Sequence, residues 1–386
     1  MAVHATRRAA PALAFGPDPE RSATLPGTFY FDPGIYARER EVIFYKSWQF
    51  VGYAADLAAA GSYIAAFVLD QPVFAIRGKD DTIRAFYNAC SHRGHTLVEG
   101  RGAKTIITCP FHAWSYDATG ALKAAGNAEN VAGFKLEDFS LSEVRCETWA
   151  NMVFVNLDPH AAPMRTMYGK LEQEFRDAVP GFDQLAFGRR DQYDLKCNWK
   201  FVFDGLECYH CPHIHPQAMG TDQSFMTTTW DTYEYDRYST HIVRTDRDVL
   251  KNHRERLPYP INEGDDVVDD YVWYMWPNYI FLAHPGPANF HVTHAMPTGP
   301  ETVHRNVDHF FVANPPSAIN LAQMNMHRDV IVPQDRAAME KQQLGVHSQG
   351  YRQGRLMVDK ERSWRSEHGV HHFDNMVWEA LNGKNY

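Results

Sequence analysis

Two short loops, each pairing one cysteine with one histidine, constrain the fold of this chain more than any other feature. The first loop reads NACSHRGHTLVEG and supplies Cys90 and His92. The second loop reads TCPFHAWSY and supplies Cys109 and His112, with sixteen residues between His92 and Cys109. Both loops lie within residues 61–157, where short β-rich segments alternate with turn sequences. Regular short strands of this kind predict a small all-β domain that brings the two loops together.

The four side chains of these loops predict one metal centre. Structural zinc takes Cys2His2 as a tetrahedral set, and a Rieske [2Fe–2S] cluster takes two cysteines on one iron and two histidines on the other. Zinc sites usually pair like with like, whereas each loop here gives one ligand of each type, which favours the Rieske cluster. Gly94 would let the backbone approach the cluster and Pro110 would stiffen the second loop. His95 has the wrong offset for a ligand and is expected beside the cluster or on the surface.

The composition sets wider limits. A chain of 386 residues is too long for one small core, so two domains are expected. The net charge of −9 argues against nucleic acid as a partner. Six cysteines in so long a chain favour metal ligation or burial over a disulfide scaffold. No apolar run approaches a membrane span, and Arg7-Arg8 begins a short disordered leader rather than a secretory signal, so a cytoplasmic location is expected.

The chain changes character at about residue 160. Asp32-Pro33 predicts the N-cap and first residue of a helix that runs to about Lys46. Beyond residue 160, helical spacing and long antiparallel strands alternate, which predicts an α+β domain. The expected helices cover 167–179, 198–211, 320–344 (interrupted by Pro333) and 374–381, and the expected strands cover 232–243, 271–283, 289–296 and 302–313. Neither GxGxxG nor GxxxxGK occurs, so no bound nucleotide is expected.

A second group of metal-binding side chains lies in ECYHCPHIHP at 207–216. A zinc knuckle would use four of its residues, Cys208, Cys211, His213 and His215. Four ligands within eight residues and without a second loop are very tight for a tetrahedral site, and both cysteines are better interpreted as small buried residues.

The sequence resembles the oxygenase (α) subunits of Rieske non-haem iron oxygenases from about Thr24 to Asn382. The likeness rests on the two cluster loops and on short segments, namely SWQFVG at 47–52, FVNLDP at 154–159, CNWK at 197–200, ECYHCP at 207–212 and WPN at 276–278. Within that family, ECYHCP is most similar to the branch of carnitine, glycine-betaine and choline monooxygenases. The resemblance implies an N-terminal leader and helix at 1–45 that packs on the catalytic domain, a Rieske domain at 46–160, and a helix-grip-like catalytic domain at 161–386.

The resemblance also implies a mononuclear Fe(II) held by two histidines and one carboxylate, with other positions open to O2. It assigns the histidine roles to His210 and His215. The carboxylate falls on Asp335, within VIVPQDRAAMEKQQLG at 330–345, and Asp329 and Glu340 remain as alternatives.

Glu207 lies three residues before His210 and would share its helix face. In the family this carboxylate links a cluster histidine of the neighbouring subunit to an iron histidine, which implies a homotrimer; the alternative is an ordinary surface glutamate. His213 is expected to be a neighbour of the iron ligands and not a ligand.

As such a subunit, the chain would receive electrons from a separate NAD(P)H-dependent flavin or iron–sulfur reductase. With O2 it would hydroxylate or N-demethylate a small substrate, for which a quaternary ammonium or betaine-type compound is favoured. Two alternatives remain, an aromatic-ring or aromatic-carboxylate hydroxylase and a Rieske protein that only transfers electrons.

Two sequence features bear on the substrate. An aromatic stretch could line a pocket by cation–π contact, although alternating aromatic residues on a strand usually belong to a core; it comprises Trp273, Tyr274, Trp276, Tyr279 and Phe281. Where the branch usually shows an acidic residue, asparagine and an aromatic residue, this chain has Phe203, Asp204 and Gly205. The missing ring would change the shape of the pocket.

Overall fold

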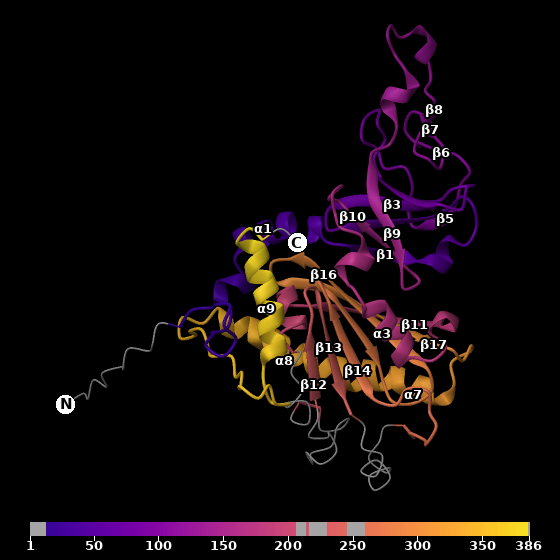
Figure 1. Cartoon of the computed structure of the whole chain (residues 1–386). Helices are drawn as coiled ribbons and strands as arrows, with labels where there is room; N and C mark the ends of the chain where they lie inside the picture. Colours follow the sequence, from indigo (N-terminus) through magenta and orange to yellow (C-terminus); the bar gives the residue numbers. More distant parts are fainter. Residues whose placement is uncertain (1–12, 206–213, 216–229, 245–258, 385–386) are drawn as a thin grey trace, which may run out of the picture.

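The computed structural model describes residues 13–205, 214–215, 230–244 and 259–384. Figure 1 shows two sheet-built parts, with the N-terminal helix α1 beside the second of them. Helix α1 (Pro33–Val42) begins as its sequence predicts, because the Asp32 side chain accepts hydrogen bonds from the backbone N–H groups of Gly34 and Ile35 at 2.7 and 3.1 Å. The helix ends at Val42, and a 3₁₀ turn (Phe44–Lys46) continues the chain to Lys46.

The first part is all-β, as predicted. Its larger sheet is antiparallel and has the order β1-β10-β9-β4-β3-β2-β5. These strands are β1 (Gln49–Tyr53), β2 (Ser62–Val68), β3 (Gln71–Arg77), β4 (Ile83–Tyr87), β5 (Arg101–Ala103), β9 (Glu143–Trp149) and β10 (Met152–Asn156). A small second sheet contains β6 (Ile107–Thr108), β7 (Ser115–Tyr116) and β8 (Leu122–Ala124), and Figure 1 shows it on the side of this part that faces away from the second part.

The second part is built on one antiparallel sheet with the order β11-β17-β16-β15-β14-β13-β12, as the α+β prediction requires. Its strands are β11 (Ala186–Leu195), β12 (Trp230–Glu234), β13 (Tyr238–Val243), β14 (Asp270–Met275), β15 (Tyr279–Ala283), β16 (Asn289–Gly299) and β17 (Thr302–Phe311). The predicted strands 232–243 and 271–283 are each wrong in one respect, because each is a hairpin of two strands. Strand β11 was not predicted; four of its ten residues are charged, and it lies at the edge of the sheet.

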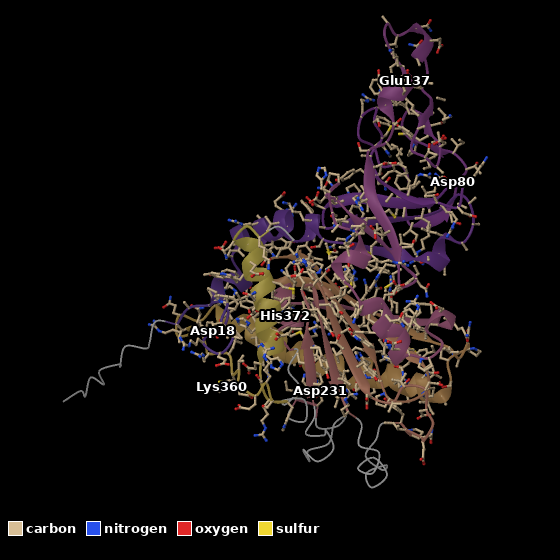
Figure 2. The ribbon with its side chains drawn as sticks, in the orientation of Figure 1. Asp18, Asp80, Glu137, Asp231, Lys360 and His372 are labelled. Atoms are coloured by element: carbon tan, nitrogen blue, oxygen red, sulfur yellow. The ribbon has the colours of Figure 1, made fainter. Side chains whose placement is uncertain are left out.

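Helices cover both faces of this sheet. On one face, which we call the outer face, Phe175 of α3 (Leu171–Ala178) packs with Trp273 and Phe281, and this core includes Trp48 from the β domain. On the inner face, Tyr274 and other side chains pack against α8 (Val332–Val346) and α9 (His368–Leu381). The aromatic stretch at 273–281 is therefore divided between two cores. Figure 2 shows His372 of α9 over this sheet and Asp80 and Glu137 on the separate β part.

The helix predicted over 320–344 is interrupted, but the interruption precedes Pro333. Helix α7 (Ala318–Met326) passes into a π-helical turn (His327–Ile331), and α8 follows with Pro333 in its first turn. Proline is tolerated there because the first N–H groups of a helix have no intrahelical partner. A short helix, α2 (Met164–Met167), precedes α3. Among the described residues, no helix is long and apolar enough to span a bilayer.

Candidate metal centres

The two Cys/His loops meet at the end of the β domain. Cys90 follows β4 and Cys109 follows β6, and both thiols are buried, each with 3% of its surface exposed. The rings of His92 and His112 lie on the exposed side with their centroids 4.8 Å apart. The fold therefore brings together two buried sulfurs and two exposed imidazoles, which is the donor set of a Rieske cluster.

Hydrogen bonds hold the first loop in shape. The backbone N–H of Cys90 donates to the carbonyl of His95 at 2.9 Å, and the N–H of Gly94 donates to the carbonyl of Cys90 at 2.8 Å. Gly94 has φ +73°, a conformation that other residues rarely adopt. The phenol oxygen of Tyr116 accepts from the N–H of Ser91 at 3.1 Å and lies 3.2 Å from the Cys90 sulfur. His95 thus contributes its backbone to the loop.

The exposed histidines have neighbours that the sequence analysis missed. The ring of His92 stacks on Trp114, with the centroids 4.7 Å apart and the planes 8° apart. The guanidinium of Arg93 donates to His112 Nε2 at 2.7 Å. The pKa of His112 is lowered, first by partial desolvation and then by the positive charge of Arg93. Trp114 and Arg93 each lie within two residues of a predicted ligand, and that proximity is the only sequence signal for them.

The donor geometry bears on which metal group fits. Among the residues that the structure describes, no three histidine, cysteine or acidic side chains are close enough together to hold a single ion. A Rieske cluster takes only two protein ligands per iron, so its loops need not converge on one point. The two loops fit the cluster.

The second centre joins His215 to helix α8. His215 Nε2 lies 3.0 Å from Asp335 Oδ1, and His215 Nδ1 lies 2.8 Å from Gln334 Oε1. His215 is buried, whereas the Asp335 side chain remains 25% exposed. Burial by itself would lower the pKa of His215, but the hydrogen bond with Asp335 and its negative charge outweigh burial and raise the pKa.

The hydrogen bond to Gln334 fixes how His215 presents its ring. Because an amide oxygen accepts only, His215 Nδ1 carries the proton and Nε2 is turned toward Asp335. An imidazole nitrogen and a carboxylate oxygen that lie this close together can supply two of the three donors of a non-haem iron site. The sequence analysis did not identify Gln334, whose signal is its position directly before the predicted ligand Asp335.

The two alternative carboxylates are engaged elsewhere. Asp329 is exposed and pairs with its neighbour Arg328 at 2.7 Å. Glu340 pairs with Arg336 at 2.9 Å and accepts from the backbone N–H of Lys196 at 3.1 Å. Both have the solvated or salt-bridged environments that were expected if they are not ligands.

Several predicted site residues lie outside the described residues, namely Glu207, Cys208, His210, Cys211 and His213. The segment just before them is described. Phe203 is completely buried in the inner-face core. Asp204 accepts a hydrogen bond from the Tyr30 hydroxyl at 2.8 Å, and burial raises the pKa of its carboxyl to about 7.

Two family models match the chain. Residues 47–135 match the Rieske [2Fe–2S] domain, and residues 182–383 match the catalytic domain of the ring hydroxylating alpha subunit. The first match contains both Cys/His loops, and the second contains His215 and Asp335.

Curated relatives match over nearly the whole chain. The carnitine monooxygenase oxygenase subunit of Escherichia coli K12 is 34% identical over 94% of this chain and 95% of its own length. The chloroplastic choline monooxygenase of Beta vulgaris is 25% identical over 94% of this chain and 78% of its own length.

Solved structures agree in fold. The quaternary ammonium Rieske monooxygenase CntA, in complex with L-carnitine, matches with a TM-score of 0.82 and 31% identity over 95% of this chain and 97% of that one. Naphthalene 1,2-dioxygenase from a Rhodococcus species matches with a TM-score of 0.76 at 17% identity, over 94% of this chain and 95% of that one, which shows the fold alone. The chain therefore belongs to the ring-hydroxylating alpha subunits of Rieske non-haem iron oxygenases, the enzymes that use a [2Fe–2S] cluster and a mononuclear iron to react with O2.

Proposed function

We propose that this chain is the oxygenase component of a system that hydroxylates or N-demethylates a quaternary ammonium compound of the betaine type. Carnitine and choline are the compounds in the names of its curated relatives. L-Carnitine and γ-butyrobetaine are bound in two solved structures of similar fold. The observation that carries the catalytic part is the 3.0 Å approach of His215 Nε2 to Asp335 Oδ1.

In this proposal the two Cys/His loops hold the cluster. Cys90 and Cys109 would ligate one iron from the buried side, and His92 and His112 would ligate the other from the exposed side. Two histidine ligands raise the reduction potential compared with four cysteines, which suits a centre that accepts electrons from a reductase. Exposure of both imidazoles leaves this edge of the cluster open to a second protein surface.

The mononuclear iron would be held by His210, His215 and Asp335, and when bound it supplies the activation of O2. The chain's own residues prepare that site. Gln334 Oε1 accepts from His215 Nδ1, so Nε2 would be the nitrogen that ligates the iron, which is the orienting role that partners of metal-bound histidines have. Asp335 is fixed on a helix, and a rigid element places a ligand more accurately than a loop does.

The proposed reaction balances with one O2, two electrons and two protons. One oxygen atom enters a C–H bond of the substrate as a hydroxyl group, and the other leaves as water. If the hydroxylated carbon is an N-methyl group, the C–N bond then breaks to give formaldehyde and the demethylated amine. NAD(P)H would supply the electrons through a separate flavin or iron–sulfur reductase, one at a time.

We further propose that the enzyme is a cytoplasmic homotrimer, and that Glu207 links His92 or His112 of one subunit to His210 of the next. Inter-subunit electron transfer is described for a quaternary ammonium Rieske monooxygenase that is 29% identical to this chain. The exposed edge of the predicted cluster site agrees with such a contact. The proposed domain limits are 1–45, 46–160 and 161–386.

Single-turnover reactions test the proposed substrate class without a matched reductase. The iron-loaded protein is reduced chemically, mixed with O2 and one compound, and the products are identified by mass spectrometry. γ-Butyrobetaine, carnitine or choline should yield a hydroxylated or demethylated product in an amount close to that of the enzyme. Turnover of benzoate or naphthalene, with none of the three quaternary ammonium compounds, would instead identify an aromatic hydroxylase. Absence of any oxygenated product would favour a protein that only transfers electrons.

A further inference from the structure

Arg305 lies on the inner face of the catalytic sheet. It sits on β17 opposite Ala295 of β16, and side chains directly opposite in an antiparallel pair point to the same face. Ala295 belongs to the core that also contains Met339 of α8 and Phe373 of α9. The Arg305 side chain therefore points to the side of the sheet on which α8 carries Asp335.

This arginine is buried without a partner. Only 5% of its surface is exposed, and its Nε has no hydrogen-bond acceptor. Among the described residues, no carboxylate forms an ion pair with its guanidinium. The neighbouring strand offers a contrast, because Arg190 of β11 donates twice to the buried carboxylate of Asp308, at 2.5 and 2.6 Å. A buried charge is normally paired because its desolvation is costly, so an unpaired one indicates a missing anionic partner.

The electrostatic surroundings place Arg305 near the proposed iron site. Burial lowers its pKa, and the largest opposing influence is the negative charge of Asp335. The pKa of His327 is lowered mainly by burial and then by the charges of two other histidines. The charge of Arg305 lowers it further, and so does that of His215. Arg305 thus belongs to the electrostatic environment of the His215–Asp335 pair, although it does not contact Asp335.

Other unpaired polar atoms share this face. Thr293 lies two residues before Ala295 on β16, so its side chain points the same way, and its hydroxyl is buried without a hydrogen-bond partner. His291 lies two residues before Thr293 on the same strand. Its Nδ1 contacts His309 Nδ1 at 2.8 Å, and its Nε2 has no partner. Arg305, Thr293 and His291 form what we call the inner polar patch. A hydroxyl next to a guanidinium can donate to the same anion.

We propose that the inner polar patch binds the anionic group of the substrate and that Arg305 is its anchor, holding a carboxylate while the other end of the molecule reaches the iron. This inference rests on the proposed function and narrows it: compounds that carry both a quaternary ammonium and a carboxylate are preferred over cationic alcohols. Arginine suits the role because its planar donors match both oxygens of a carboxylate.

Equilibrium binding to the oxidised, iron-loaded protein tests the anchor by calorimetry, without turnover. γ-Butyrobetaine carries the carboxylate and choline lacks it. Arg305→Gln should weaken γ-butyrobetaine by about 100-fold and choline by less than about 3-fold, because loss of one partner of a buried charge pair affects only the ligand that forms it. Arg305→Lys should retain part of the preference. Arg336→Gln is the matched control: it removes the same charge from α8 beside Asp335, and it should leave both affinities within about 3-fold.

A second measurement separates an anchor from a structural arginine. Removal of a buried, unpaired charge relieves a desolvation cost, so Arg305→Met should leave the thermal midpoint of the ligand-free protein unchanged or higher. A fall of several degrees, or equal weakening of γ-butyrobetaine and choline in Arg305→Gln, would show that Arg305 supports the fold instead.

Benzoate and its uncharged counterpart, benzyl alcohol, distinguish failure of the anchor from failure of the proposed function. Suppose that the wild-type protein binds benzoate and neither quaternary ammonium compound, and that Arg305→Gln weakens the binding of benzoate but not that of benzyl alcohol. The anchor then stands, and the proposed substrate class is wrong. If γ-butyrobetaine binds the wild type and Arg305→Gln equally well, the anchor is wrong and the substrate class stands. A wild-type protein that binds choline and neither carboxylate would contradict the anchor alone, and one that binds none of these compounds would contradict both.

Discussion

At the scale of single residues, the centres depend as much on the partners of their ligands as on the ligands. His215 presents Nε2 toward Asp335 because Gln334 Oε1 accepts a hydrogen bond from its Nδ1. His92 is held by stacking on Trp114. Motif spacing predicts ligands because the metal dictates their type and order. It does not predict these partners, because a stacked ring or an amide acceptor can be supplied from many positions.

Asp204 gives a residue-scale prediction on pH. Its buried carboxyl has a pKa of about 7, above the ordinary value of 3.8, so the folded state binds a proton that the unfolded state has lost between these pH values. The stability contribution of Asp204 therefore falls as the pH rises from about 4 to about 7. Asn removes the titration and keeps an oxygen for the Tyr30 hydroxyl. The thermal midpoint of Asp204→Asn should rise relative to the wild type between pH 5 and pH 8; a constant difference would show that Asp204 is ionised in the fold.

At the scale of elements, the Asp32-Pro33 cap predicted helix α1, short β-rich segments between turn residues predicted the all-β domain, and strand patterns predicted an antiparallel second sheet. The sequence patterns failed at other elements. Segments 232–243 and 271–283 were each predicted as one strand, although turn-forming residues mark both hairpins: Asp236 lies between β12 and β13, and Pro277 and Asn278 lie between β14 and β15. Strand β11 carries the charged sequence RRDQYD at a sheet edge, where pairing with β17 overrides low strand propensity. The π-helical turn before α8 likewise has no signal in the apolar pattern, whereas Pro333 suggested a break a few residues too late.

One buried ion pair ties α1 to the catalytic domain. Lys200 Nζ donates to Glu39 Oε1 at 2.5 Å, Trp199 Nε1 donates to Glu39 Oε2 at 2.9 Å, and the side chains of the ion pair are fully buried. Glu39→Gln leaves the ammonium group of Lys200 uncompensated, which should lower the free energy of unfolding by about 3–5 kcal/mol in denaturant titrations. Glu41→Gln, on the exposed side of the same helix, should change it by less than about 0.5 kcal/mol. Equal effects of the two changes would refute a special role for this pair.

At the scale of the whole molecule, the proposed trimer makes two defective chains complement each other. Cys90→Ser should remove the cluster and Asp335→Ala the mononuclear iron, so each variant alone should be inactive. If electrons cross between subunits, trimers reassembled from both chains should regain a substantial fraction of wild-type turnover, because a cluster from one chain then faces an iron in another. Mixed trimers that form, as shown by native mass spectrometry, and remain inactive would place the electron route within one subunit.

The most direct test of the two-centre account is the iron content per chain, measured together with the EPR signal of the reduced cluster. Wild-type protein should contain about three irons per chain and show a Rieske signal. Asp335→Ala should contain about two, with that signal unchanged, because α8 supplies a ligand to the mononuclear site and none to the cluster. About three irons in Asp335→Ala, or a wild-type protein that contains only the two cluster irons, would contradict the assignment of Asp335 and His215 to an iron site.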